Sequence, residues 1–341
     1  MNHKIEIPHK LLGEDGALLE PGWATKLIME YSPFDVKAHK MRIKEWDYYI
    51  VVDNDGYAFT TTIADNRYMG LVNANFFDFN ESSKKSFLTP LVMPMGSLNM
   101  PTDSAKGDIY IKKRFSQVSV IHEKYGRRIT GHYQKCPMHD KIDFDIFLYQ
   151  DKKDDTMVIA TPWEEDKTAF YYNQKINCMP AEGYVEFGGR KHFFTPDRNF
   201  ATLDWGRGVW TYDNTWYWGS GNGYVNGKRF GYNIGYGFGN TTAASENMIF
   251  YDGKCHKIDR LRFEIPEDDL LQPWKFISSD GKFDMEFFPI YDNASKFNAF
   301  LFSQNSHQVF GRVNGKAILD DGTVLKISNL LAFAERVRNR Y

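Results

Sequence analysis

Residues 204–239 contain the stretch that most constrains the fold: DWGRGVW (204–210), TWYWGSGNG (215–223) and FGYNIGYGFG (230–239). Four of the 8 tryptophans and ten of the 27 glycines of the chain lie in this aromatic-glycine window. A glycine beside a large aromatic side chain lets a strand curve tightly and lets the ring lie over bare backbone, as happens in β-barrels. The window therefore predicts strongly curved β-structure.

The rest of the chain carries the same β signals. Two alternating apolar segments, 48–52 and 57–63, flank Asp-Asn-Asp-Gly at 53–56, which predicts a β-hairpin with a tight turn. Apolar residues alternate with Asp143 and Asp145 in segment 142–148, so one face of that strand is expected to be buried. Turn pairs of the Asn-Gly, Asp-Gly or Gly-Gly type recur at 188–189, 226–227, 252–253, 280–281, 314–315 and 321–322. Together these signals predict an all-β chain.

Three features suggest how the chain is divided. A polar turn region around 150–168 is the best domain boundary, which gives a first β unit at 1–165 and a second at 166–341. Residues 76–108 contain three prolines and little alternation, so we predict a long irregular excursion there. Residues 329–340 have the spacing of apolar residues that predicts a short amphipathic C-terminal helix.

Composition excludes several classes of protein. The 341 residues include 42 Lys+Arg against 44 Asp+Glu, and this balance gives no electrostatic reason to expect a nucleic-acid partner. Neither a signal peptide nor a run of about 18 apolar residues is present, so we expect a cytoplasmic protein without a membrane span. The three cysteines lack CxxC spacing, and we expect no metal and no cofactor. The oligomeric state is left open.

The aromatic-glycine window also supplies the candidate site. Its aromatic side chains share strand faces, so they form either a packed barrel wall or the lining of a cavity for an apolar or ring-shaped small molecule. The ligand-binding candidates are Trp205, Trp210, Trp216, Trp218, Tyr232 and Tyr236, with the polar run Tyr172, Asn173, Lys175 and Asn177. An aspartate packed against indole has a raised pKa, so Asp204 is a candidate general acid with Arg207 as its partner, and Glu246 is a second carboxyl. Alternatively, Asp204 and Arg207 form a surface ion pair that holds a turn.

Several long strings resemble the family known as domain of unknown function 2804. They are 43–49, 170–180, 204–219, 246–248 and 333–340, and the resemblance covers essentially the whole chain. This family brings no established activity.

A more distant resemblance is to the carotenoid 1,2-hydratase group and its calycin-like relatives. Trp205-Gly206 and the Trp-Tyr-Trp-Gly string at 216–219 match two parts of that group's pattern, but its histidine is absent because Thr202, Leu203 and Asp204 precede Trp205. The resemblance implies two calycin-like (lipocalin-like) β-barrel or sandwich units around an apolar ligand.

These observations predict a cofactor-independent enzyme that acts on an apolar or cyclic small molecule by acid catalysis, as a hydratase, isomerase or cyclase does. Asp204 would donate the proton, and tryptophan faces would stabilise developing positive charge. One alternative is a non-catalytic carrier of a lipophilic ligand. Another is a carbohydrate-active hydrolase that uses Asp204 and Glu246 as paired carboxyls.

Overall fold

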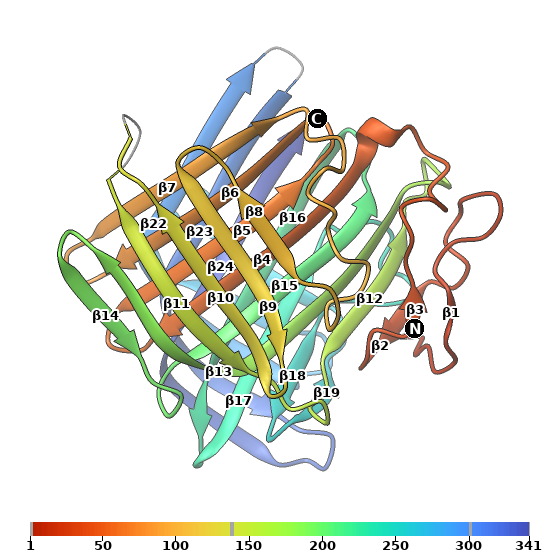
Figure 1. Cartoon of the computed structure of the whole chain (residues 1–341). Coiled ribbons are helices and arrows are strands. Elements are labelled where there is room, and N and C mark those ends of the chain that lie inside the picture. The colour runs from red at the N-terminus through yellow and green to blue at the C-terminus, as the bar shows by residue number, and fades with distance from the viewer. Residues whose placement is uncertain (1–2, 137–139, 300–301, 341) are drawn as a thin grey trace.

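The computed structural model describes residues 3–136, 140–299 and 302–340 (Figure 1). Its regular structure consists of two large antiparallel sheets, a parallel pair formed by β1 (His9–Lys10) and β3 (Met29–Glu30), and a 3-10 helix, η1 (Lys40–Arg42). The predicted all-β fold is therefore confirmed. Within these ranges no helix has both the length and the apolar character needed to cross a membrane.

The first sheet has thirteen strands and curls around its own core. Its strands are β2 (Gly22–Ala24), β4 (Ile43–Asp53), β5 (Tyr57–Asp65), β6 (Met69–Asp78), β7 (Ser83–Val92), β8 (Ile109–Lys112), β9 (Ser116–Glu123), β10 (Gly126–Tyr133), β11 (Ile142–Tyr149), β12 (Met157–Pro162), β13 (Phe170–Phe187), β14 (Arg190–Phe194) and β15 (Phe200–Val209). The main order runs β7-β6-β5-β4-β15-β13-β11-β10-β9-β8. A hydrogen bond between the Thr89 and Ser116 hydroxyls (2.7 Å) joins β7 to β9, so the two ends of the sheet approach each other.

The second sheet has nine strands, in the order β19-β18-β17-β16-β24-β23-β22-β21-β20. They are β16 (Asp213–Val225), β17 (Lys228–Tyr236), β18 (Met248–Tyr251), β19 (Lys254–Lys257), β20 (Leu261–Glu264), β21 (Trp274–Ser278), β22 (Phe283–Ala299), β23 (Phe302–Ile318) and β24 (Val324–Arg340). This sheet also curls, as a contact between strands near its two ends shows: the Tyr236 ring of β17 packs on the Phe263 ring of β20 with centroids 5.6 Å apart.

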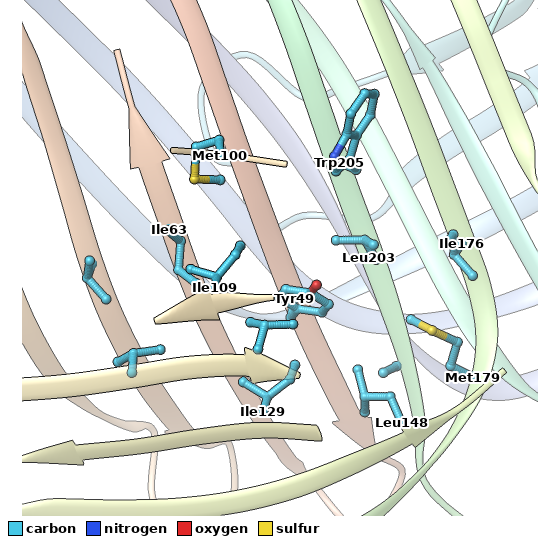
Figure 2. Close-up of a cluster of buried hydrophobic side chains, with 14 of the residues drawn as sticks. Tyr49, Ile63, Met100, Ile109, Ile129, Leu148, Ile176, Met179, Leu203 and Trp205 are labelled. Carbon is cyan, nitrogen blue, oxygen red and sulfur yellow. The ribbon is translucent and has the colours of Figure 1, made fainter. Parts of the chain in front are cut away.

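Buried apolar side chains form three clusters, since each strand of the central region is covered on both faces. The first interior lies inside the first sheet and includes Tyr49, Leu203 and Trp205 (Figure 2). The second interior lies inside the second sheet and includes Tyr232 and Trp274. The inter-sheet layer lies between the two sheets, where Phe77 of the first packs on Phe310 of the second with ring centroids 4.8 Å apart, and where Tyr171 and Trp218 are also buried.

The predicted C-terminal helix is wrong, because residues 324–340 form strand β24 between β16 and β23. Leu331 and Phe333 face the inter-sheet layer, whereas Leu330, Ala332 and Ala334 face the second interior. A strand that is buried on both faces has apolar residues at consecutive positions, and over a few residues this pattern also fits one face of a helix.

The irregular excursion predicted for 76–108 is correct only from residue 93 onward, because 76–78 belong to β6 and 83–92 form β7. Pro90 lies in β7, which is an edge strand, and edge strands are where proline is tolerated because an N–H on their outer side has no neighbouring strand to bond. The boundary expected at 165/166 falls between β12 and β13 in the first sheet, while the chain changes sheet between Val209 and Asp213. The division into two domains stays a prediction.

Candidate functional site

A cavity of about 290 Å³ lies in the inter-sheet layer, where β4, β13 and β15 face β16 and β24. Two carboxyl groups, from Asp204 and Glu335, line it. Partly exposed polar residues, among them Asn66, Gln304 and Ser306, also line it and connect it to the surface. Its aromatic lining comprises Trp46, Tyr48, Tyr171, Trp210, Trp216, Trp218 and Phe238. An aromatic pocket with a few convergent polar groups is typical of a small-molecule site.

Strand alternation explains why Asp204 faces this cavity. Successive side chains of a strand point to opposite faces, and Figure 2 shows Leu203 and Trp205 pointing together into the first interior. Asp204, between them, therefore points into the inter-sheet layer. The same alternation in β16 turns Trp216 and Trp218 toward the cavity.

A buried ion pair forms beneath the cavity. Lys175 of β13 lies directly opposite Asp204 in the β13–β15 ladder, and its Nζ is 2.8 Å from Asp204 Oδ1. The Asn173 amide donates to the same oxygen at 2.6 Å. The ammonium group also lies 4.2 Å from the centroid of the Trp218 ring, a distance at which a cation is attracted to the ring face. Within the described residues, no hydrogen bond to Asp204 Oδ2 is found, so this oxygen is available to a ligand.

Glu335 is the second carboxyl of the cavity, and β24 places it opposite Trp218 of β16. Burial raises the pKa of Glu335 from its ordinary value of 4.5 to about 7. The negative charge of Asp204 adds to this rise, whereas the positive charge of Lys175 opposes it. A carboxyl with this pKa holds a proton in a large fraction of molecules at neutral pH and can donate it.

Glu246 lies behind the cavity rather than in its lining. Its side chain is 1% exposed, and the Tyr171 hydroxyl donates to its Oε1 at 2.7 Å. Burial raises the pKa of Glu246, and the cation of Lys175 opposes that rise. Lys175 thus acts on the titration of both glutamates, Glu246 and Glu335, and pairs directly with Asp204.

The family profile described as Domain of unknown function (DUF2804) matches residues 2–341 of the sequence. The chain belongs to the DUF2804 family. This confirms the family suggested by the sequence strings. No curated protein sequence matches the chain.

Solved structures resemble this chain at low sequence identity. Kievitone hydratase from Nectria haematococca has a TM-score of 0.51 and 11% identity, with 98% of each chain covered. CghA with Sch210972 has a TM-score of 0.46 and 11% identity, with 96% of this chain and 97% of that one covered. A putative ATTH from Nitrosomonas europaea has a TM-score of 0.44 and 11% identity, with 93% and 99% covered. The first of these likenesses shows a common fold for this DUF2804 chain, and confirms the resemblance to the hydratase-like group at the level of fold.

The structure distributes the sequence-predicted site residues among three places. Four of them line the cavity: Asp204, Trp210, Trp216 and Trp218. Three pack directly behind it: Asn173, Lys175 and Glu246. Six lie elsewhere: Trp205, Arg207, Tyr172, Tyr232, Tyr236 and Asn177.

The expected pairing of Asp204 with Arg207 is wrong, because the two residues point to opposite faces of β15. The Arg207 guanidinium is buried against Trp205, with its carbon 4.3 Å from the ring centroid, and donates to Asp47 Oδ1 at 3.0 Å. Tyr172 also belongs to the first interior, where its hydroxyl donates to the Met29 carbonyl at 2.8 Å.

The other predicted site residues that lie outside the cavity are separated from it by the second sheet or by distance along β13. Tyr232 is buried in the second interior and Tyr236 packs against it, because these side chains of β17 point away from the inter-sheet layer. Asn177 does face the layer, but its amide donates to Ser220 Oγ (2.8 Å) and Asn222 Oδ1 (3.1 Å) in a separate polar network.

Sequence reasoning missed Glu335 together with Trp46, Tyr48 and Tyr171. Glu335 lies in the segment that was assigned to a helix, and this hid its position next to Trp218. Trp46 and Tyr48 alternate along β4 with Glu45 and Asp47, so polar or aromatic groups occur on both faces and alternation alone does not identify the cavity side. In the described ranges no group of three or more His, Cys, Asp or Glu side chains is arranged to hold a metal ion.

Proposed function

We propose that this protein is a cofactor-independent enzyme that acts on an apolar or cyclic small molecule by acid catalysis, through hydration, isomerisation or cyclisation. The observation that carries the proposal is Glu335, a carboxyl with a pKa of about 7 in an aromatic cavity. General acids work best when their pKa lies near the operating pH.

Glu335 is the proton donor in this proposal, in place of Asp204. Asp204 is engaged as a carboxylate by Lys175, so it is suited to accept a proton or to stabilise positive charge. Oδ2 is the Asp204 oxygen that accepts the proton or contacts the positive charge, because Oδ1 already accepts hydrogen bonds from Asn173 and Lys175. For hydration, Glu335 gives a proton to the substrate while Asp204 takes one from the attacking water, so no net proton is consumed.

The aromatic walls have two tasks. They exclude water from the reacting atoms, and their negative ring faces stabilise a cationic intermediate. Trp218 is less suited to the second task because the Lys175 ammonium already occupies one of its faces at 4.2 Å. Trp210 and Trp216, whose ring centroids are 5.2 Å apart, are the better candidates.

The fold supports this choice of reaction class, because it is shared with a protein named as a hydratase, kievitone hydratase. The lipophilic carrier is the less favoured alternative, because two carboxyl groups converge in the cavity whereas a carrier needs an apolar one. The carbohydrate-active hydrolase is also less favoured, because Glu246 is 1% exposed and cannot contact a sugar without rearrangement.

The experiment is a mass-spectrometric screen of cyclic alkenes, enones and prenylated phenols for addition of water or conversion to an isomer. We expect E335Q to lose at least about a hundredfold in turnover of any substrate found, the usual contribution of a general acid. E267Q, at an exposed position, is the matched control. Full activity of E335Q contradicts the proposal. A stoichiometric lipid in solvent extracts, together with no turnover, supports the carrier.

A further inference from the structure

The environment of Tyr48 suggests which chemical group the cavity recognises. The side-chain amide nitrogen of Gln308, on β23, donates to the Tyr48 hydroxyl at 2.9 Å and to Glu335 Oε1 at 2.8 Å. Both oxygens therefore lie around one nitrogen atom, and their separation cannot exceed the sum of these two distances. Tyr48 and Glu335 both line the cavity, so the pair is accessible to a ligand.

Gln308 also determines where the two protons lie. Because the Tyr48 oxygen accepts from Gln308, its own O–H must point elsewhere, and in the described part of the chain no acceptor for it is found. Burial raises the pKa of Tyr48 well above 10, so the phenol keeps its proton. Because Glu335 Oε1 accepts from Gln308, Oε2 is the oxygen left to carry the proton of the neutral carboxyl, and the Trp216 side chain is a further hydrogen-bond partner of this carboxyl.

Two O–H groups that face the same cavity from neighbouring side chains can donate to a single oxygen atom. Each O–H···O hydrogen bond spans about 2.7 Å, so one acceptor oxygen can bridge donors that are separated by up to twice that length. Neutral donors fixed in an apolar pocket stabilise the negative charge that develops when a carbonyl becomes an enolate. The aromatic walls provide flat surfaces for the ring that carries this oxygen.

We propose that Tyr48 and Glu335 together bind one oxygen atom on an sp² carbon, and that the substrates are therefore small cyclic ketones, enones or phenols. This inference rests on the proposed function, which needs a protonated Glu335, and it adds the substrate class and a second donor. Gln308 is a positioning residue in this arrangement, since it contacts the substrate only through the two donors.

The test uses 2-naphthol as a probe for the oxygen and naphthalene as its matched control without one, with binding followed by fluorescence. We expect 2-naphthol to bind the wild type more tightly than naphthalene. In Y48F its affinity should fall about fivefold, the usual effect of one lost hydrogen bond, while naphthalene binding stays unchanged. Unchanged naphthalene binding also shows that the variant is folded.

A second variant tests the other donor. Wild-type affinity for 2-naphthol should fall between about pH 6 and about pH 8.5, because Glu335 loses its proton in this range. E335Q keeps an N–H donor at every pH, so its affinity should not change over the range. The proposal is overturned if 2-naphthol binds no more tightly than naphthalene, or if Y48F weakens both probes equally.

The outcomes also separate this inference from the proposed function. If E335Q loses turnover in the screen while Y48F leaves 2-naphthol binding intact, the acid assignment stands and the oxygen site is refuted. If E335Q keeps turnover while 2-naphthol binding depends on Tyr48, the oxygen site stands and the acid assignment is refuted.

Discussion

Replacing Lys175 with methionine tests the electrostatics of the site most directly. The lysine side chain is 1% exposed and forms the 2.8 Å ion pair with Asp204. Methionine has a similar length and its sulfur packs favourably on an aromatic ring such as that of Trp218, so K175M removes the charge with little change in packing. Removal of one partner from a buried ion pair costs about 3–5 kcal/mol, because the other charge stays buried without compensation.

We expect the lower end of that range, about 3 kcal/mol, for two structural reasons. Asp204 keeps its hydrogen bond from Asn173, and it lines the cavity, where water can solvate Oδ2.

The assay is urea unfolding, followed by tryptophan fluorescence and circular dichroism, on K175M, D204N and the double variant. The double variant removes both charges of the pair, so its loss of stability should be at least about 2 kcal/mol smaller than the sum of the single losses. K153M, at an exposed position, is the control and should match the wild type. A loss below about 1 kcal/mol in K175M, or strictly additive effects, would refute the assignment of a buried, coupled pair.

Three further predictions use other features of the structure. Burial raises the pKa of Glu335 in the folded protein to about 7, so the wild type loses stability as the pH rises from 4.5 to about 7. E335Q lacks this carboxyl, so its stability relative to the wild type should increase over that range by on the order of 2 kcal/mol in urea titrations. An equal difference at both ends of the range would contradict this. G206A should lower the melting temperature and weaken naphthalene binding, because the added Cβ would lie 2.0 Å from the Trp46 ring of the cavity wall. If the melting temperature and the binding are both unchanged, the Trp46 ring can move freely and the prediction is wrong. Burial raises the pKa of the Cys178 thiol to about 12, so iodoacetamide followed by peptide mapping should leave it unmodified at neutral pH until the protein is unfolded.

The aromatic-glycine window predicted the cavity in part, because strand alternation depends only on local backbone geometry. Trp216 and Trp218 share a face of β16 as expected, and both line the cavity. The same reasoning failed for Trp205, since alternation cannot say which face of a strand points to a site when both faces are buried. Trp205 follows Asp204 in the sequence, but its indole lies in the first interior and not beside the Asp204 carboxyl in the cavity.

Glu335 could not be predicted for a different reason. Its position depends on the pairing of β24 with β16, which brings together segments from opposite ends of the second sheet's sequence. No local pattern encodes such a pairing, and the consecutive apolar residues 330–334 favoured a helix instead. The partner of Arg207 was missed in the same way, because Asp47 comes from a strand far away in the sequence.

The location of the cavity between two sheets links ligand binding to the contact between them. A ligand that contacts Asp204 on one sheet and Glu335 on the other binds only while the sheets are associated, so its binding stabilises their association. At a concentration a hundred times its dissociation constant it would contribute about 2.7 kcal/mol to the stability of the associated form. The melting temperature of the protein is therefore a direct sensor of its natural ligand, and a thermal-shift screen can find that ligand before the reaction is known.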